Sequence, residues 1–479
     1  MVIESLKYKI LQQFGFAPTQ EQGQALDTFV SFLTDRDPQA VMILRGSAGT
    51  GKTSLSGAIV RTLLQIRQKV MLLAPTGRAA KVFSLGSGAP AYTIHRRIYR
   101  EKAFAGVDGQ FSLNDNLYTD TLFMVDEASM IANMGLGGTT FGSGCLLDDL
   151  VKFVYQGHND RLLLIGDKAQ LPPVGEEESP ALSASVMEGY GLKVYECDLN
   201  EVLRQSQSSG ILYNATLIRQ MITHDAVTGL PLIRFKGFAD IVMMPGAELV
   251  ESLGDSYHHV GMDETMVITR SNKRANIYNN GIRNMVLDRE EELSSGDMLM
   301  IVKNNYFWTE KEKKESGEGS AGAVPTFLAN GDRAKVLRVS NYIELYGFRF
   351  ATLLLQLPDY DDYEMQVTGM LDTLQSEAPA LTHEQQEELF RQVEEDYQHF
   401  VPLKADRMKS IRQDAYFNAL QIKYAYAVTC HKAQGGQWAH VYVDQGYMTD
   451  DMLTPDYIHW LYTAFTRATD KLFLVNWPK

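Results

Sequence analysis

The sequence is poor in cysteine and in long apolar runs. Its 479 residues include three cysteines, Cys145, Cys197 and Cys430, which lie far apart and form no CxxC pair. A disulfide framework or a zinc site is therefore not expected, and this cysteine usage favours a reducing cytoplasm. No stretch approaches the roughly 20 apolar residues that cross a bilayer. The N-terminus also lacks the apolar core of a signal peptide, so we expect no membrane partner.

Positive charge is also scarce. Lysine and arginine number 45 against 59 acidic residues, which gives a net charge of −14 and a pI near 5.3. Taken alone, this balance argues against a nucleic-acid partner, because phosphate binding needs local positive charge. A basic groove can still lie on an acidic body, so the test is whether basic residues cluster near the chemistry.

Short β-rich apolar runs alternate with helical stretches in two sets. The first set comprises residues 41–44, 70–74, 121–125, 161–165 and 193–197, and the second comprises 266–269, 424–429, 440–443 and 472–475. Such alternation is typical of parallel sheets covered on both faces. The sequence therefore predicts an α/β fold with two domains.

The second set is interrupted by a segment of different composition. Residues 311–323 are charged and rich in glycine and serine, which predicts a mobile surface loop. Residues 333–369 contain short strand-like runs separated by turn formers, which predicts a small antiparallel barrel. Thr382 and Gln385 form a capping-box pattern, so a helix is expected near 383–400.

A phosphate-binding loop follows the first strand. Residues 46–53 read GSAGTGKT, the pattern GxxxxGK[ST]. Its glycines let backbone N–H groups wrap phosphates, and the helix that follows points its positive end at them. Lys52 is expected to reach the terminal phosphates, and the Thr53 hydroxyl to ligate Mg²⁺. The other residues expected to contact nucleotide here are Gly46, Ala48, Gly49, Thr50 and Gly51. The alternative is a glycine-rich turn that matches by chance.

Two further strand ends carry candidate catalytic residues. Asp126 and Glu127 end the run 121–125, at the place where an open α/β sheet puts its ligand crevice. Asp126 is expected to hold Mg²⁺ through water, and Glu127 to polarise the attacking water as general base. Gln170, after the run 161–165, could orient that water or sense the γ-phosphate. A solvated strand end and a plain turn are the alternatives.

An ordered series of motifs runs along nearly the whole chain. It reads GSAGTGKT (46–53), LAPTGRAAKVF (73–83), TIHR (93–96), VDEASM (125–130), GDKAQLPPVG (166–175), LNEVLRQ (199–205), TCHKAQG (429–435) and LYTAFTRAT (461–469). This series resembles superfamily 1 DNA helicases, in particular the RecD-like and Dda-like branch. One departure from the Dda-like pattern is Gly77, where those relatives carry a histidine. The glycine-rich segment 134–144 has no assigned role.

The resemblance implies two RecA-like P-loop domains with ATP between them. The first domain would cover 1–205, with a β-hairpin insertion at about 97–120. The second would combine 206–310 and 421–479, and an SH3-like β-barrel with a helix would occupy 311–420. Gln22 looks like the adenine-reading glutamine, while Arg204 and Arg467 look like arginines that reach the γ-phosphate from the second-domain side.

The resemblance also implies contacts to a DNA strand. The matching positions are Pro75, Thr76, Thr93, His95, Thr429, His431 and Lys432, and Gly435 would link that strand to the nucleotide. Residues 93–102 pass the charge test, because Arg96 and three further basic residues alternate with aromatic ones. A solvated helix face is the alternative. The Asp108-Gly109 pair predicts a hairpin turn, and Phe104 or Phe111 could cap the last base pair of a duplex.

These patterns predict a monomeric ATP- and Mg²⁺-dependent helicase. It would move on single-stranded DNA, act at junctions of single- and double-stranded DNA, and work with replication or recombination proteins. The resemblance gives the direction as 5′ to 3′. One alternative is a RecD-like subunit of an exonuclease complex. Another is a nucleotide-switched DNA-binding or remodelling ATPase without unwinding.

Overall fold

The structure is a computed structural model of the chain. It describes residues 2–101, 111–135, 142–201, 208–223, 229–316, 325, 327–449 and 452–477. Contacts divide the chain into two compact units, one of residues 1–242, 433–437 and 447–472, the other of 243–432, 438–446 and 473–479. Among the described residues, no helix has the length and apolarity to span a bilayer.

Six parallel strands form the central sheet of the first unit, in the order β3-β2-β6-β7-β1-β8. Their bounds are β1 (Ala40–Gly46), β2 (Lys69–Ala74), β3 (Ala91–Thr93), β6 (Thr121–Val125), β7 (Arg161–Gly166) and β8 (Lys193–Leu199). Strands β1, β6 and β7 are buried along their whole length. Helices on both faces explain why these strands read as continuous apolar runs.

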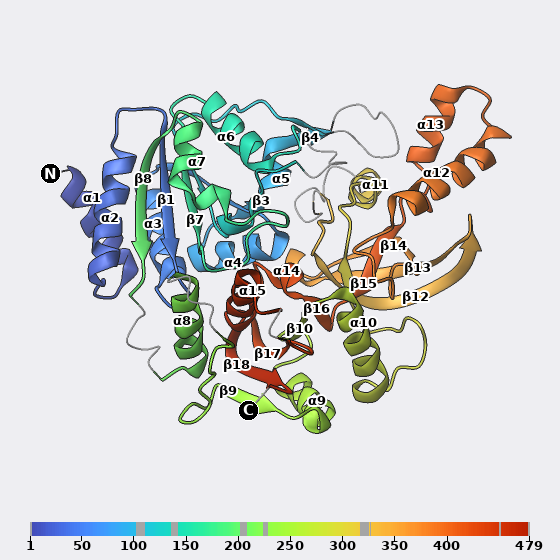
Figure 1. Cartoon of the computed structure of the whole chain (residues 1–479). Coiled ribbons are helices and arrows are strands. Elements are labelled where there is room, and N and C mark those ends of the chain that lie inside the picture. The colour runs from blue at the N-terminus through green and yellow to red at the C-terminus, as the bar shows by residue number, and fades with distance from the viewer. Residues whose placement is uncertain are drawn as a thin grey trace. The chain divides into compact units, whose positions relative to one another are not determined.

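Successive residues of a strand face opposite sides, so each strand of this sheet serves two cores. Met42 and Leu44 of β1 pack with the helices α1 (Val2–Phe14), α2 (Gln20–Leu33) and α3 (Lys52–Gln65). Val41 and Ile43 pack with α5 (Ile94–Ile98), α6 (Leu146–Gln156) and α7 (Ala184–Gly189). Figure 1 shows these helices flanking the strands.

The first unit also contains three further helices and a strand pair. They are α4 (Gly77–Ser87), α8 (Gly210–Thr223), α15 (Pro455–Phe465) and the strand pair β4 (Tyr99–Glu101) with β5 (Phe111–Leu113). Helix α8 packs against α15. The antiparallel register joins Tyr99 to Leu113 and Glu101 to Phe111. The predicted turn at Asp108-Gly109, like Phe104, lies outside the described residues.

A second α/β sheet has the strand order β16-β10-β17-β18-β9. The bounds are β9 (Ile241–Met244), β10 (Thr265–Thr269), β16 (Ala427–Thr429), β17 (Trp438–Asp444) and β18 (Ala468–Val475). Strand β10 pairs in parallel with β16 and with β17. The helices of this part are α9 (Leu249–His259), α10 (Asn272–Gly281), continued by a π-helical turn (Ile282–Val286), and α14 (Cys430–Ala433).

A closed five-stranded barrel lies in the second unit. Its strands are β11 (Met298–Ile301), β12 (Arg333–Leu345), β13 (Phe348–Leu357), β14 (Tyr363–Met370) and β15 (Leu420–Tyr424). Helices α12 (His383–Gln398) and α13 (Lys404–Arg412) follow β14 (Figure 1) and share an apolar core with Phe350 and Met370. The predicted capping box at Thr382 and Gln385 is confirmed.

The predicted fold class is confirmed: two parallel α/β sheets, a strand pair in the first unit and a barrel in the second. Three local expectations need correction. The barrel predicted at 333–369 is not wholly antiparallel, because β14 pairs in parallel with β15, and its strands β11 and β15 lie outside that range. The apolar run 424–429 divides between barrel strand β15 and sheet strand β16, and residues 311–316 belong to helix α11 (Phe307–Ser316) instead of a loop. The rest of that loop, 317–323, lies outside the described residues. The domain boundaries stay a prediction.

Candidate functional site

Several candidate residues of the first unit directly follow the carboxyl ends of its parallel strands, and they lie at one edge of the sheet. Strand β1 leads into the phosphate loop, β6 into Asp126, β7 into Asp167, and β2 into Pro75. Parallel pairing places these strand ends side by side, and this edge is where open α/β sheets bind ligands. The sequence predictions that depend on strand ends therefore meet in one region.

The phosphate loop has the backbone that its glycines predict. Gly49 and Gly51 have φ values of 77° and 80°, in the left-handed region that favours glycine. Gly51 is the N-cap of α3, so the helix begins directly at Lys52. The Lys52 ammonium donates to the carbonyls of Gly46 and, at 2.9 Å, of Ser47. The cation thus lies over the loop, where it could meet terminal phosphates.

Gln22 is built into the same loop. Its side-chain amide donates to the Thr50 carbonyl at 2.9 Å, and its carbonyl oxygen accepts from the Thr19 amide at 3.0 Å. Thr19 caps the Gln22 amide in return, which completes a capping box at the start of α2. Gln22 therefore connects α2 to the phosphate loop, and its reading of adenine stays a prediction.

The acidic pair after β6 combines a left-handed backbone at Glu127 with a raised pKa at Asp126. Glu127 has φ 53° and ψ 37°, a left-handed conformation that non-glycine residues rarely adopt. Burial, and then the neighbouring charge of Glu127, raise the pKa of Asp126 to about 7. A divalent cation would favour the ionised form of Asp126 and offset this repulsion. The pair therefore fits the metal-holding role that its position predicts.

The loop after β7 provides a buried acceptor. The Gln170 side chain is buried, and its Oε1 has no hydrogen-bond partner among the described residues. Buried polar atoms are normally satisfied, so this oxygen fits a water or ligand atom that it would orient. Asp167, at the start of the loop, accepts hydrogen bonds from the Ala169 amide and from the Tyr462 hydroxyl.

Tyr462 is a residue of the site that sequence reasoning missed. Its hydroxyl accepts from the amide of Ala48 in the phosphate loop at 3.0 Å and donates to Asp167 Oδ2 at 2.6 Å. Burial, and then the charge of Asp167, raise the pKa of this phenol well above its ordinary value. The residue lies inside the quoted motif LYTAFTRAT, but no local pattern indicates what a tyrosine there would contact.

Of the two predicted arginines, one can be placed. Arg467 is buried, and it donates to the carbonyls of Thr463 and Gly436 and to the Thr466 hydroxyl, at 3.1 to 3.2 Å. All three acceptors are neutral, so Arg467 holds the turn after α15 against residue 436. Arg204 lies outside the described residues, and both arginine roles stay predictions.

Two adjacent residues connect the nucleotide side of the site to a predicted DNA contact. Gln434 donates to the carbonyl of Leu171, which follows Gln170, at 2.7 Å. Gly435 has φ 73°, and a Cβ there would lie 3.1 Å from the Thr76 hydroxyl oxygen and 3.1 Å from Ala79. Any larger residue would crowd the first turn of α4, so glycine permits this close approach.

The predicted DNA residues of the first unit also lie at the edge of its sheet. Thr76 caps α4 by accepting from the Ala79 amide, and Thr93 caps α5 by accepting from the Arg96 amide. Thr93 is paired with Ala74, directly before Pro75. The Arg96 guanidinium lies 5.1 Å from the ring centre of Tyr92. Helix N-termini and stacked arginines suit contacts with a nucleic-acid backbone.

His95 is half-buried beside this edge. Its ring centre lies 5.7 Å from that of Tyr99, whose hydroxyl donates to Asp149 at 2.7 Å. Burial lowers the pKa of His95 to about 4, although the charge of Asp149 opposes this shift. His95 is therefore neutral at physiological pH and would serve as a neutral hydrogen-bonding group.

The described part of the glycine-rich segment has a structural role that the sequence did not indicate. The Gly142 amide donates to the carbonyl of Phe111 at 2.8 Å, and the Ser143 amide donates to Asp149 at 3.0 Å. A Cβ at Gly142 would lie 2.0 Å from an Asp149 oxygen. Glycine is thus required where this segment supports strand β5.

The remaining predicted DNA residues belong to the second unit. Thr429 ends β16 and is paired with Thr269 of β10, and α14 follows with His431 and Lys432. The Lys432 ammonium donates to Asn330 Oδ1. Burial, and then the charge of Lys423, lower the pKa of Lys432 to about 8. Lys432 is therefore a cation that titrates just above neutral pH.

This titration predicts a pH dependence of DNA binding. Lys432 is mostly charged at pH 7 and mostly neutral at pH 9, so the predicted contact of Lys432 with a DNA phosphate should weaken as pH rises through 8. We expect affinity for single-stranded DNA to fall roughly threefold to tenfold over this range, and Lys432→Arg to reduce the fall, because guanidinium stays charged. Fluorescence anisotropy with both proteins measures it. An equal fall in both would exclude Lys432 as the titrating contact.

Comparisons with known proteins match both parts of the chain. A family model described as an AAA domain matches residues 17–229, and one described as a UvrD-like helicase C-terminal domain matches 424–475. Together these matches cover more than half of the chain.

Two curated relatives carry helicase names. The ATP-dependent RecD2 DNA helicase of Deinococcus radiodurans is 30% identical over 157 residues, 33% of this chain and 18% of the relative. The ATP-dependent DNA helicase dda of Enterobacteria phage T4 is 25% identical over 267 residues, 54% of this chain and 55% of the relative. The chain thus spans less than two thirds of either relative.

A solved structure of the Pif1 helicase from Bacteroides, in complex with ADP-AlF3 and ssDNA, has 13% identity and a TM-score of 0.46, and the match covers 96% of this chain and 93% of that chain.

The parallel sheet, its phosphate loop and the acidic pair at the end of β6 define a P-loop nucleotide-binding protein. Within that class, the motif series and the two family matches indicate similarity to helicases. The chain is similar to the superfamily 1 helicases of the RecD and Dda type.

Proposed function

We propose that this chain is an ATP-dependent DNA helicase that moves along single-stranded DNA from 5′ to 3′ and separates duplex ahead of it. The two family matches support the class of reaction, and the relatives named RecD2 and dda are described as ATP-dependent DNA helicases. Action at junctions of single- and double-stranded DNA, as a monomer, belongs to the same proposal.

One observation supports coupling between nucleotide and DNA most directly. The adjacent residues Gln434 and Gly435 contact the loop that carries Gln170 on one side and the capping residue Thr76 on the other. A change at the nucleotide can therefore reach a predicted DNA contact through one short segment. Such a physical connection is what a translocating ATPase needs, because hydrolysis must alter the grip on the strand.

The residues present fit a bound MgATP. Thr53 and Asp126 would hold Mg²⁺, which would neutralise charge on the phosphates. Lys52 would bind the terminal phosphates together with the loop amides, and Glu127 would take a proton from the attacking water. Gln170 would orient that water with its buried, unpartnered Oε1. Arg204 and Arg467 would stabilise charge that develops on the transferred phosphoryl group, as predicted from the motifs.

The DNA strand would contact small polar groups and backbone amides at the ends of β2 and β3, including Thr76, Thr93 and Pro75. Lys432, His431 and Thr429 would supply contacts from the second unit. Contacts of this kind bind phosphate and sugar without reading sequence. We therefore expect binding that depends on salt and only weakly on base sequence.

A strand-displacement assay tests this proposal. The purified chain is mixed with ATP, Mg²⁺ and duplexes that carry either a 5′ or a 3′ single-stranded tail. We expect unwinding of the 5′-tailed duplex, and none when ATP is omitted. Unwinding of the 3′-tailed duplex alone would contradict the proposed direction.

The same assay separates the alternatives. DNA-stimulated ATP hydrolysis without strand separation would favour a nucleotide-switched remodelling protein. Unwinding that requires added partner proteins would favour a subunit of a larger exonuclease complex. Light scattering of the active fraction would show whether the unwinding species is a monomer.

A further inference from the structure

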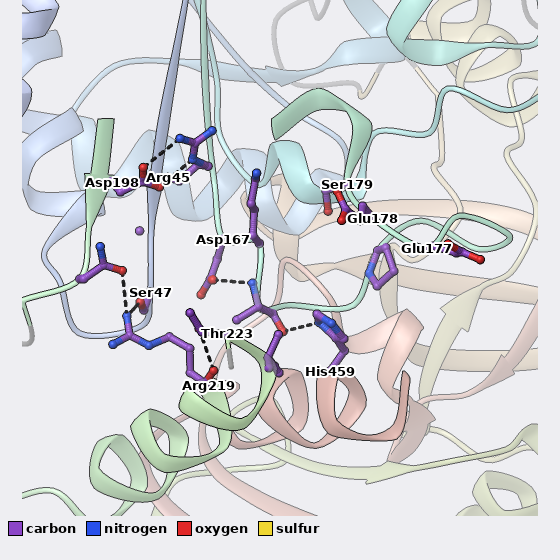
Figure 2. A pocket seen from close by; sticks show the side chains of 16 residues that line it. Arg45, Ser47, Asp167, Glu177, Glu178, Ser179, Asp198, Arg219, Thr223 and His459 are labelled. Carbon is purple, nitrogen blue, oxygen red and sulfur yellow. Dashed lines mark hydrogen bonds and ion pairs between the residues drawn. The ribbon is translucent and has the colours of Figure 1, made fainter. Parts of the chain in front are cut away.

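A cavity of about 390 Å³ lies beside the start of the phosphate loop in the first unit. Its lining includes Gly46 and Ser47 of the phosphate loop, Asp167 of the loop after β7, and Arg219 of α8. Figure 2 shows the Arg219 side chain extending from α8 to Ser47. A cation that belongs to none of the predicted motifs, Arg219, therefore lies at the edge of the predicted phosphate site.

Four carboxylates, Asp167, Glu177, Glu178 and Asp198, are in the lining of this cavity, but Arg219 forms its described hydrogen bonds with neutral groups. One guanidinium nitrogen donates to the Ser47 hydroxyl and, at 3.4 Å, to Asn200 Oδ1. Both acceptors are neutral, and in the described part of the chain no carboxylate forms an ion pair with Arg219. Arg45, which lines the same cavity, is instead paired with Asp198 at 2.7 Å. Arg219 is thus the arginine of this cavity that is available to an anion.

Two cations are anchored on one residue of the loop. The Lys52 ammonium donates to the Ser47 carbonyl at 2.9 Å, while Arg219 donates to the Ser47 hydroxyl. Like charges that contact the same residue repel each other, and an anion that contacts both relieves the repulsion. Guanidinium also binds phosphate oxygens in a fixed forked geometry. A phosphate bound by Lys52 would therefore lie within the reach of Arg219.

Helix α8 does not depend on Arg219 for its position. The Gly210 amide at its start and the Ser209 hydroxyl both donate to Asp240, at 2.8 and 2.5 Å. Asn214 donates to the Arg234 carbonyl at 2.9 Å, and the helix packs on α15. Removal of the Arg219 side chain should therefore leave the fold intact, so its effect on ligands can be measured.

We propose that Arg219 contacts the terminal phosphate of the nucleoside triphosphate held by the phosphate loop, and so distinguishes a triphosphate from a diphosphate. This inference deepens the proposed function and rests on its nucleotide site. It adds a substrate-contacting cation from α8 to the arginines that the motifs predicted.

The test compares two ligands on one variant. Affinities for Mg·ADP and for a non-hydrolysable Mg·ATP analogue are measured by calorimetry, without DNA, for the full chain and for Arg219→Ala. Loss of one charge-assisted hydrogen bond should weaken the triphosphate analogue about 10- to 100-fold and change ADP less than about twofold. Arg36→Ala is the matched control, because Arg36 is exposed in the loop before β1. It should leave both affinities unchanged.

Arg219→Gln provides a second variant, since it keeps a donor for Ser47 but removes the charge. It should show the same selective loss as Arg219→Ala, with a thermal midpoint close to that of the wild-type chain. Equal weakening of both nucleotides, or no weakening in either variant, would overturn the inference. A wild-type chain that fails to unwind DNA would overturn the proposed function alone, because the affinity ratio is measured without DNA.

Discussion

Replacing Lys52 with alanine is expected to reduce ATP turnover by roughly 10²- to 10³-fold or more. The ammonium lies over the phosphate loop, where it donates to Gly46 and Ser47. Its charge is expected to move onto the terminal phosphates and to stabilise the charge that develops on them during transfer. Phosphate release at saturating single-stranded DNA measures the effect.

Lys9→Ala is the control for this substitution. Lys9 is an exposed lysine of α1 in the same unit, so its removal changes the net charge equally without touching the loop. Turnover by Lys9→Ala should equal that of the wild-type chain. Near-wild-type turnover by Lys52→Ala would contradict the assignment of the phosphate site, whatever the DNA binding of the variant.

Replacing Glu127 with glutamine should separate nucleotide binding from hydrolysis. The amide keeps the size of the side chain but cannot accept the proton of the attacking water, so the chemical step should slow roughly 10²- to 10⁴-fold. The substitution also removes the like charge that helps to raise the pKa of Asp126. Asp126 then ionises at lower pH, and binding of Mg·nucleotide should be retained or strengthened.

Single-turnover hydrolysis and nucleotide affinity measure these two effects of Glu127→Gln. Glu188→Gln, at an exposed position of α7, is the matched control and should change neither. If Glu127→Gln hydrolyses ATP at the wild-type rate, the general base is another group. If it loses nucleotide binding as well, Glu127 supports the loop instead of the chemistry.

The parts of the fold that depend on local pattern were predictable from the sequence. Buried parallel strands read as short apolar runs, and the loop at 46–53 needs glycine where φ is positive, so both are visible in the residues themselves. The closed barrel was only partly predictable. Its strands β11 and β15 are more than a hundred residues apart, and periodicity does not show which strands will pair.

Site residues that belong to a single local motif were predictable from the sequence. Contacts between side chains from distant segments were not. Tyr462 and Arg219 reach the phosphate loop from α15 and α8, and nothing near them in sequence indicates that contact. Gln22 illustrates a different omission. Thr19 and Gln22 have the spacing of a capping box, so the glutamine also has a structural task at the start of α2.

The hydroxyl of Tyr462 would compete with a phosphate for a donor of the loop. It accepts from the Ala48 amide, which the loop would otherwise offer to a phosphate oxygen, and it donates to Asp167. A triphosphate that binds this amide must therefore break the hydrogen bond between Ala48 and Tyr462. Helix α15 would then lose one of its contacts to the phosphate loop, so the hold of α15 on the loop is expected to weaken when a triphosphate binds.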